Sequence, residues 1–205
     1  MRNNKKGFTL VELMIVIAIL AILAAIVIFA LNPAELFRRA RDSQRMSDIR
    51  VLSSAISYYL ADATTPILDG STNTLCTGGT GNDTIFSTIP NATAVTGWTW
   101  TSSTVRTVDS LGWLKINFSL NGSSPIGQLP MDPSNTIGTA NTSAPSLYYT
   151  FACDTSLNYE INANMESTNY KAKESDDGGN SAVIYEMGTN TAILPTTGTG
   201  YYPFN

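Results

Sequence analysis

The sequence contains no histidine among its 205 residues and only two cysteines. Histidine is the commonest general base and the commonest zinc ligand, so its absence removes the usual acid–base and zinc chemistry. Two cysteines are too few for a cysteine-rich metal site. A glycine-rich phosphate loop, a nucleophile elbow and a pair of catalytic carboxylates are also lacking. We therefore expect a protein that is not an enzyme and that holds no organic cofactor.

Charge is scarce, at 14% of residues, and it is unevenly distributed. Residues 33–50 carry five arginines against three acidic residues, whereas residues 51–205 carry four basic and twelve acidic residues. A basic segment before an acidic one suits contacts between neighbouring copies in an assembly, although single surface ion pairs are weak. The acidic part gives no general attraction for nucleic acid.

One long run lacks charge altogether. Leu13 to Leu31 is 19 residues long and contains no glycine or proline. As a helix it would reach roughly 28 Å, close to the hydrocarbon thickness of a bilayer. Glu12 lies at its entrance, and an unpaired carboxylate in lipid is costly, so Glu12 calls for a partner or a polar edge. A secretory signal peptide and a plain membrane anchor are two other interpretations, but neither explains a glutamate soon after a Gly-Phe junction.

The stretch Lys6-Gly7-Phe8-Thr9-Leu10-Val11-Glu12 before this run resembles the N-terminus of type IV prepilins and pseudopilins. In that family a dedicated peptidase cuts after the glycine and methylates the new N-terminal phenylalanine. The resemblance therefore implies cleavage after Gly7, N-methylation of Phe8 and a role for Glu12 in assembly. It also implies that the N-terminus is cytoplasmic before cleavage and that the rest of the chain lies outside the inner membrane.

The resemblance implies an α+β pilin fold, in which the C-terminal half of a long N-terminal membrane-spanning helix packs on a small antiparallel sheet. The expected parts are a leader peptide at residues 1–7, a transmembrane and assembly helix at residues 8–31, and an amphipathic half-helix at residues 32–61. A globular head at residues 62–187 and a polar tail at residues 188–205 follow. Asn32-Pro33 predicts either a kink near residues 29–33 or a new helix that Asn32 caps, with Pro33 in its first turn.

Residues 34–61 predict an amphipathic helix, because apolar residues recur at spacings of three and four. This stripe consists of Ile49, Leu52, Ile56, Tyr59 and Leu60. Four charged residues lie off the stripe, namely Arg38, Arg41, Asp42 and Arg45, and the arginines are expected to be solvated. Their spacing of four makes Arg38–Asp42 an attractive pair and Arg41–Arg45 a repulsive pair.

The rest of the chain predicts a loop region at residues 62–96 and then short strands. The predicted strands are Trp98–Trp100, Leu114–Leu120, Tyr148–Cys153, Leu157–Met165 and Ala182–Met187. The third and fourth are expected to form a hairpin around residues 154–156. Alternation in the fourth predicts that Leu157, Tyr159, Ile161, Ala163 and Met165 point inward and that Asn158, Glu160, Asn162 and Asn164 point outward. The polar tail is expected to be loosely held.

Cys76 and Cys153 are predicted to form one disulfide, because the head is expected in an oxidising compartment outside the cytoplasm. The bond would close a loop of nearly 80 residues and would stabilise the fold by roughly 4 kcal/mol in the chain-entropy model. Two free buried thiols are the alternative.

The acidic stretch at residues 174–180 contains two glycines and predicts either a solvated turn or a calcium site. Major pseudopilins bind calcium in a loop of this region, so the resemblance implies Glu174, Asp176 and Asp177 as candidate calcium ligands. The segment Leu129–Pro133 is similar to the one that precedes the sheet in major pseudopilins of type II secretion. Ser134-Asn135 stands here where those proteins have Trp-Gly.

These observations predict a structural subunit of a type IV pilus-like filament. Its expected partners are further copies of itself, the prepilin peptidase, an inner-membrane assembly platform and, before assembly, membrane lipid. A pseudopilin of a type II secretion or DNA-uptake machine is the alternative within the class. The alternative from another class is a membrane-anchored binding or adhesion protein with Trp98, Trp100 and Trp113 on its surface. Aromatic residues in a small sheet more often belong to the core.

Overall fold

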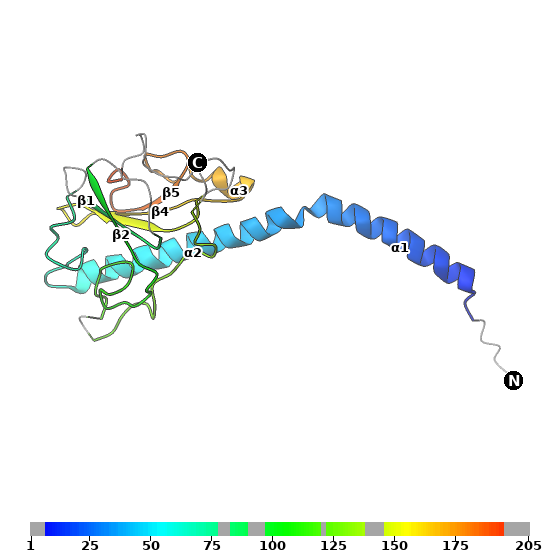
Figure 1. The fold of residues 1–205 in the computed structure, drawn as a ribbon, viewed down its shortest axis with the longest axis horizontal. Coiled ribbons are helices and arrows are strands. Elements are labelled where there is room, and N and C mark those ends of the chain that lie inside the picture. The colour runs from blue at the N-terminus through cyan, green and yellow to red at the C-terminus, as the bar shows by residue number, and fades with distance from the viewer. Residues whose placement is uncertain (1–6, 78–82, 90–96, 120–121, 138–145, 195–205) are drawn as a thin grey trace. The chain divides into compact units, whose positions relative to one another are not determined.

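The computed structural model describes residues 7–77, 83–89, 97–119, 122–137 and 146–194. The chain divides into two compact units, Met1–Arg38 and Arg39–Asn205 (Figure 1). The first unit holds α1 (Leu10–Leu31) and the first residues of α2 (Pro33–Asp62). The second unit, the head, holds the rest of α2, five strands and the short α3 (Thr168–Lys171). This is an α+β arrangement consistent with the pilin fold, as predicted.

The break between α1 and α2 lies at Asn32. Its backbone is left-handed, with φ of 40° and ψ of 73°, a conformation that asparagine tolerates better than most residues. The Asn32 carbonyl accepts hydrogen bonds from the backbone N–H groups of Glu35 and Leu36, so it also starts α2. Pro33 occupies the first position of α2, where a missing N–H costs nothing. The predicted interruption near residues 29–33 is therefore confirmed.

In the head, α2 lies beside the sheet and supplies one side of the main core (Figure 1). The predicted apolar stripe is confirmed, because Ile49, Leu52, Ile56 and Tyr59 are all buried. The prediction that the arginines off this stripe are solvated is wrong for Arg45, whose exposed fraction is 0%, and Asp42 has the same exposed fraction. They are buried because partners from distant parts of the chain cover them.

The five strands form one sheet in the order β2-β1-β3-β4-β5. Their bounds are Asp83–Ser87 for β1, Trp98–Ser102 for β2, Thr150–Cys153 for β3, Tyr159–Ala163 for β4 and Tyr185–Gly188 for β5. The predicted hairpin is β3–β4. The sheet is mostly antiparallel, but β1 and β2 pair in parallel. The predicted antiparallel sheet is therefore confirmed except for this pair of strands at one edge.

Two predictions about strands are wrong. Residues 62–96 were expected to be loop, yet they contain β1, a short apolar segment between turn-forming residues. Leu114–Leu120 was expected to be a strand, but in its described part only an isolated bridge joins Asn117 to Asp109. Leu114, Ile116 and Phe118 are nevertheless buried, because this segment packs against α2 without a continuous ladder.

The face of the sheet away from α2 is also buried. Glu160, Asn162 and Asn164 were expected to point outward to solvent, but all three are buried. The backbone N–H groups of Ile193 and Leu194 donate to Glu160 Oε2 at 2.8 and 2.9 Å, so residues 189–194 cover this face. Ile85 and Ala152 pack with Ile193 and Leu194 in a second apolar cluster. The first residues of the predicted loose tail are thus packed, and residues 195–205 lie outside the described part of the chain.

Candidate functional site

Helix α1 begins with a complete capping box. Thr9 has an extended backbone, and its hydroxyl accepts a hydrogen bond from the Glu12 backbone N–H at 3.2 Å. The Thr9 backbone N–H and hydroxyl each donate to Glu12 Oε2 at 2.8 Å. This reciprocal pair satisfies donors that every helix leaves free at its N-terminus. Gly7 and Phe8 therefore precede the helix, and the junction between them is not part of it.

The Gly7–Phe8 junction is open to solvent in the described structure. Phe8 is 87% exposed, and a Cβ added at Gly7 would meet no atom within 4 Å. An enzyme could therefore reach this peptide bond without unwinding α1. The sequence prediction that this bond is a processing point stays a prediction, and the local geometry is compatible with it.

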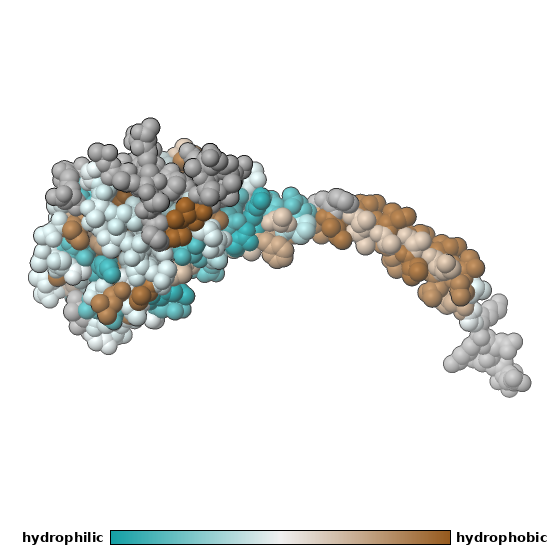
Figure 2. All heavy atoms as spheres, viewed as in Figure 1, coloured by the Kyte–Doolittle hydropathy of each residue, from teal (hydrophilic) through white to brown (hydrophobic). Residues whose placement is uncertain are grey.

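The surface of α1 is apolar on all sides. Leu10–Ile28 has a mean hydropathy of 3.1, and none of this segment is buried (Figure 2). It is long and apolar enough to cross a membrane. A helix that is hydrophobic all round does not stay in water by itself, so it needs lipid or other apolar helices around it. Glu12 is the only charged residue of α1, and it lies in the first turn.

Residues 2–28 match the family model of the prokaryotic N-terminal methylation motif. This motif is the prepilin-type signal of type IV pilins and pseudopilins, so the resemblance carried by Lys6–Glu12 is confirmed. Together with an apolar helix and an α+β head, the motif supports a type IV pilin-like or pseudopilin subunit. The motif marks a structural class of protein, and together with the apolar helix it fits anchoring in a membrane. No solved structure matches the chain.

A buried ionic cluster fixes α2 to the head. The Arg45 guanidinium donates to both oxygens of Asp132, at 2.6 and 2.9 Å, and to Asp42 at 2.8 Å. It also lies 2.7 Å from Glu166 Oε1. Burial alone would lower the pKa of Arg45, but these carboxylates raise it overall. One cation therefore joins α2 to the segment at residue 132 and to the turn before α3.

The neighbouring charges complete this cluster. Arg41 also pairs with Glu166, so the predicted repulsion between Arg41 and Arg45 is offset by a carboxylate that both contact. Asp42 accepts hydrogen bonds from the backbone N–H groups of Glu166 and Ser167 at 2.9 and 2.7 Å. The described contact of Arg38 is with Glu35 at 3.8 Å, and the predicted pair with Asp42 is not seen. Sequence reasoning missed this cluster, although Asp132 stands in the segment that resembles pseudopilins.

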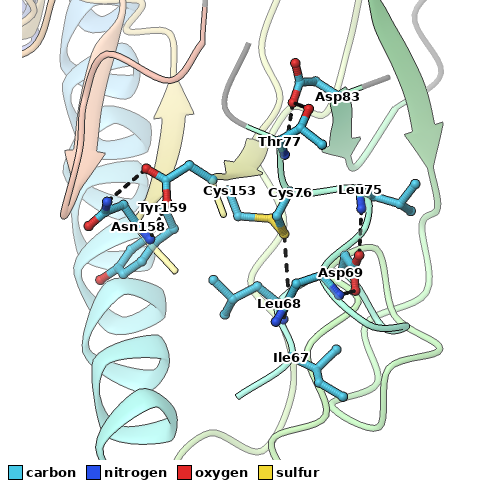
Figure 3. The surroundings of a disulfide bond; sticks show 12 residues. Ile67, Leu68, Asp69, Leu75, Cys76, Thr77, Asp83, Cys153, Asn158 and Tyr159 are labelled. Carbon is cyan, nitrogen blue, oxygen red and sulfur yellow. Dashed lines mark hydrogen bonds between the residues drawn. A yellow bond between two sulfur atoms is a disulfide. The ribbon is translucent and has the colours of Figure 1, made fainter. Parts of the chain in front are cut away.

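The structure joins Cys76 and Cys153 in a disulfide, and the described residues contain no free cysteine (Figure 3). Cys153 ends β3, whereas Cys76 belongs to the loop that follows α2. Asp69 shapes this loop, because its carboxylate accepts hydrogen bonds from the backbone N–H groups of Ser71, Asn73 and Leu75. The bond therefore ties an irregular loop to the centre of the sheet.

The three candidate calcium ligands do not converge in the described structure. Glu174 is buried and accepts a hydrogen bond from the Met165 backbone N–H at 2.8 Å. Asp177 accepts from the backbone N–H groups of Gly179 and Glu186, whereas Asp176 is exposed. Among the described residues there is no group of three or more acidic or cysteine side chains that could hold a metal ion. Calcium binding by this segment stays a prediction.

The tryptophans belong to the interior more than to the surface. Trp113 is fully buried, and its indole N–H donates to the Pro130 carbonyl at 2.9 Å. Trp98 and Trp100 are half-buried and pack against the second apolar cluster. They do not form the exposed aromatic surface that a carbohydrate-binding head would present.

Proposed function

We propose that this chain is a structural subunit of a type IV pilus-like filament that assembles through α1. The observation that carries the proposal is the methylation motif at residues 2–28, placed on a helix that is apolar on all sides and unburied in its own chain. Before assembly, lipid surrounds this helix. In the filament, helices of other copies take the place of lipid, so nonpolar surface stays away from water throughout.

Processing precedes assembly in this proposal. A prepilin peptidase cuts between Gly7 and Phe8 and methylates the new amine. Gly7 has no side chain, so the backbone can enter a tight catalytic site. The exposure of Phe8 and the start of α1 at Leu10 leave this peptide bond accessible. The new N-terminus is then a positive charge four residues before Glu12.

Glu12 pairs with the N-terminal amine of a neighbouring copy during assembly. In its own chain, both Thr9 donors go to Oε2 of Glu12, so the carboxylate keeps its position at the start of α1. An amine that enters from a neighbour would neutralise this charge in an apolar bundle. Breaking one partner of a buried ion pair typically costs about 3–5 kcal/mol, because the other charge stays uncompensated. The pair therefore sets the axial register of the copies.

The proposal is tested by isolating sheared surface fibres and the membrane fraction from the native host and measuring the N-terminus in each by mass spectrometry. We expect fibres composed of this chain, starting at N-methylated Phe8. Gly7→Leu should accumulate uncleaved chain in the membrane and yield no fibres. Intact chains starting at Met1 in both fractions would contradict the proposal. Electron microscopy of the cells then distinguishes a long surface pilus from a short pseudopilus.

A further inference from the structure

A small pocket opens in the head between the loop that follows α2 and the segment at residues 110–117. Its volume is about 170 Å³, and its lining comes from α2, the loop and the segment, namely Tyr59, Ile67, Gly70, Ser110, Lys115 and Asn117. Figure 3 shows Ile67 in that loop, which the disulfide at Cys76 ties to β3. We call this site the Lys115 pocket. Pockets for drug-sized ligands measure about 300–1,000 Å³, so only a small molecule fits here.

The walls of the Lys115 pocket are fixed before any ligand arrives. The Tyr59 hydroxyl accepts a hydrogen bond from the Ile67 backbone N–H at 2.9 Å and donates to the Ile67 carbonyl at 3.3 Å, which holds the tyrosine in place. Gly70 has a φ of 77°, and a Cβ there would lie 2.9 Å from the Lys115 Cβ, so the lysine packs directly on this turn. Because the site is preformed, a ligand loses little affinity to the ordering of its walls.

The polar side chains that line the pocket can all donate hydrogen bonds. Ser110, Lys115 and Asn117 are half-buried. Asn117 Oδ1 already accepts from the Ser119 backbone N–H at 3.0 Å, so the amide nitrogen is the group left for a ligand. Among the described residues, none accepts a hydrogen bond from that nitrogen, from the Ser110 hydroxyl or from the Lys115 ammonium. A fitting ligand therefore supplies acceptor atoms.

The acidic residues next to the pocket in the sequence are engaged elsewhere. The Asp69 carboxylate accepts hydrogen bonds from three backbone N–H groups of its own loop. The Asp109 carboxylate accepts from the Leu111 backbone N–H at 3.2 Å. Neither lines the pocket, and no described carboxylate forms a salt bridge with Lys115. The pocket therefore presents one uncompensated positive charge beside an aromatic and aliphatic floor.

We propose that the Lys115 pocket binds a small organic carboxylate, an activity that does not depend on the filament function. The carboxylate accepts a charge-assisted hydrogen bond from the Lys115 ammonium and further hydrogen bonds from Ser110 and Asn117. The apolar part of the ligand lies against Tyr59 and Ile67, where its burial adds to the affinity. Lys115 repels a cation of the same size, and a neutral amide lacks the charge that complements the lysine.

The charge preference is tested with butyrate, butyramide and butylamine, which share a four-carbon body. The full-length protein is isotopically labelled for NMR in a non-ionic detergent, and the backbone amide signals of Gly70 and Asn117 report on the pocket. We expect butyrate to shift both signals and to bind at least about tenfold more tightly than butyramide or butylamine. Equal affinities for the three probes, or butyrate that shifts neither signal, would overturn the proposal.

A matched pair of variants then assigns the binding to Lys115. Lys115→Gln removes the charge from the pocket, whereas Lys173→Gln removes the charge of an exposed lysine that does not line it. We expect Lys115→Gln to weaken butyrate binding at least about tenfold and Lys173→Gln to leave it unchanged, with equal melting temperatures.

A third variant changes the sign of the charge beside the lysine. Asn117→Asp can still accept the hydrogen bond from the Ser119 backbone N–H, but it adds a negative charge, so it should also weaken butyrate binding. Unchanged butyrate binding in both Lys115→Gln and Asn117→Asp would refute the site and leave the filament function untouched. Absence of fibres from the unmodified chain would instead refute the filament function alone.

Discussion

Replacement of Arg45 should destabilise the head far more than replacement of an exposed arginine on the same helix. Arg45 has an exposed fraction of 0% and is within 2.9 Å of oxygens of Asp42, Asp132 and Glu166. Arg45→Met keeps most of the aliphatic packing and removes the charge. It therefore isolates the electrostatic part of the cluster.

The magnitude follows from what remains after the substitution. Asp132 keeps hydrogen bonds from the backbone N–H groups of Ser134 and Asn135, but no described cation replaces Arg45 there. Removing one partner of a buried ion pair costs about 3–5 kcal/mol. For a domain of this size that corresponds to a fall in melting temperature of about 6–20 °C. Arg38 is the matched control, because its side chain is 53% exposed and its pair with Glu35 is worth about 0–1 kcal/mol.

The assay is thermal unfolding of the full-length protein in detergent, followed by circular dichroism. The double variant Arg45→Met with Asp132→Asn should lose less stability than the sum of the two single variants, because the charges are coupled. If Arg45→Met lowers the melting temperature no more than Arg38→Ala does, the cluster does not hold α2 to the head.

The disulfide, the buried acids and the acidic loop give further predictions. Without reductant, thiol alkylation should label neither Cys76 nor Cys153, and reduction should lower stability by roughly 4 kcal/mol in the chain-entropy model; full labelling of the freshly isolated protein would contradict the bond. Burial, with a smaller contribution from Glu160, raises the pKa of Glu186 to about 8. The folded head favours the protonated form of Glu186, so the contribution of this group to stability is fully present below its ordinary pKa of 4.5 and is lost as the pH rises through about 8. Glu186→Gln removes the buried negative charge and should therefore raise the melting temperature at about pH 8.5 but not at about pH 4.5. An identical gain at both values would refute the assignment. If Glu174, Asp176 and Asp177 bind calcium, chelation should lower the melting temperature, and coincident curves with and without calcium would exclude the site.

Local patterns made the N-terminal part of the chain predictable. The N-terminal methylation motif, the apolar run and the break at Asn32-Pro33 each depend on residues close together in the sequence. The α2 stripe was predictable for the same reason, because helical spacing alone decides which side chains share a face. The strand at Leu114–Leu120 failed because alternation indicates burial on one side but does not guarantee a neighbouring strand.

Long-range partners made the rest unpredictable. Arg45 and Asp132 are 87 residues apart in the sequence. The helix pattern therefore shows that Arg45 lies off the apolar stripe, but it does not show the carboxylate that pairs with Arg45 in the interior. Alternation along β4 predicts that Glu160 faces solvent, but residues 189–194 cover that side of the sheet. Both errors share one cause: the solvent exposure of a side chain depends on segments that local sequence patterns do not reveal.

The most direct test of the central claim is the fibre yield of Glu12→Gln when it is the only copy in the cell. The glutamine amide oxygen can still accept the Thr9 hydrogen bonds, so the capping box survives while the charge is lost. Glu35→Gln is the matched control outside α1. The account predicts normal insertion and cleavage but a fibre yield at least about tenfold below that of the control. A fibre yield equal to that of the control would contradict it.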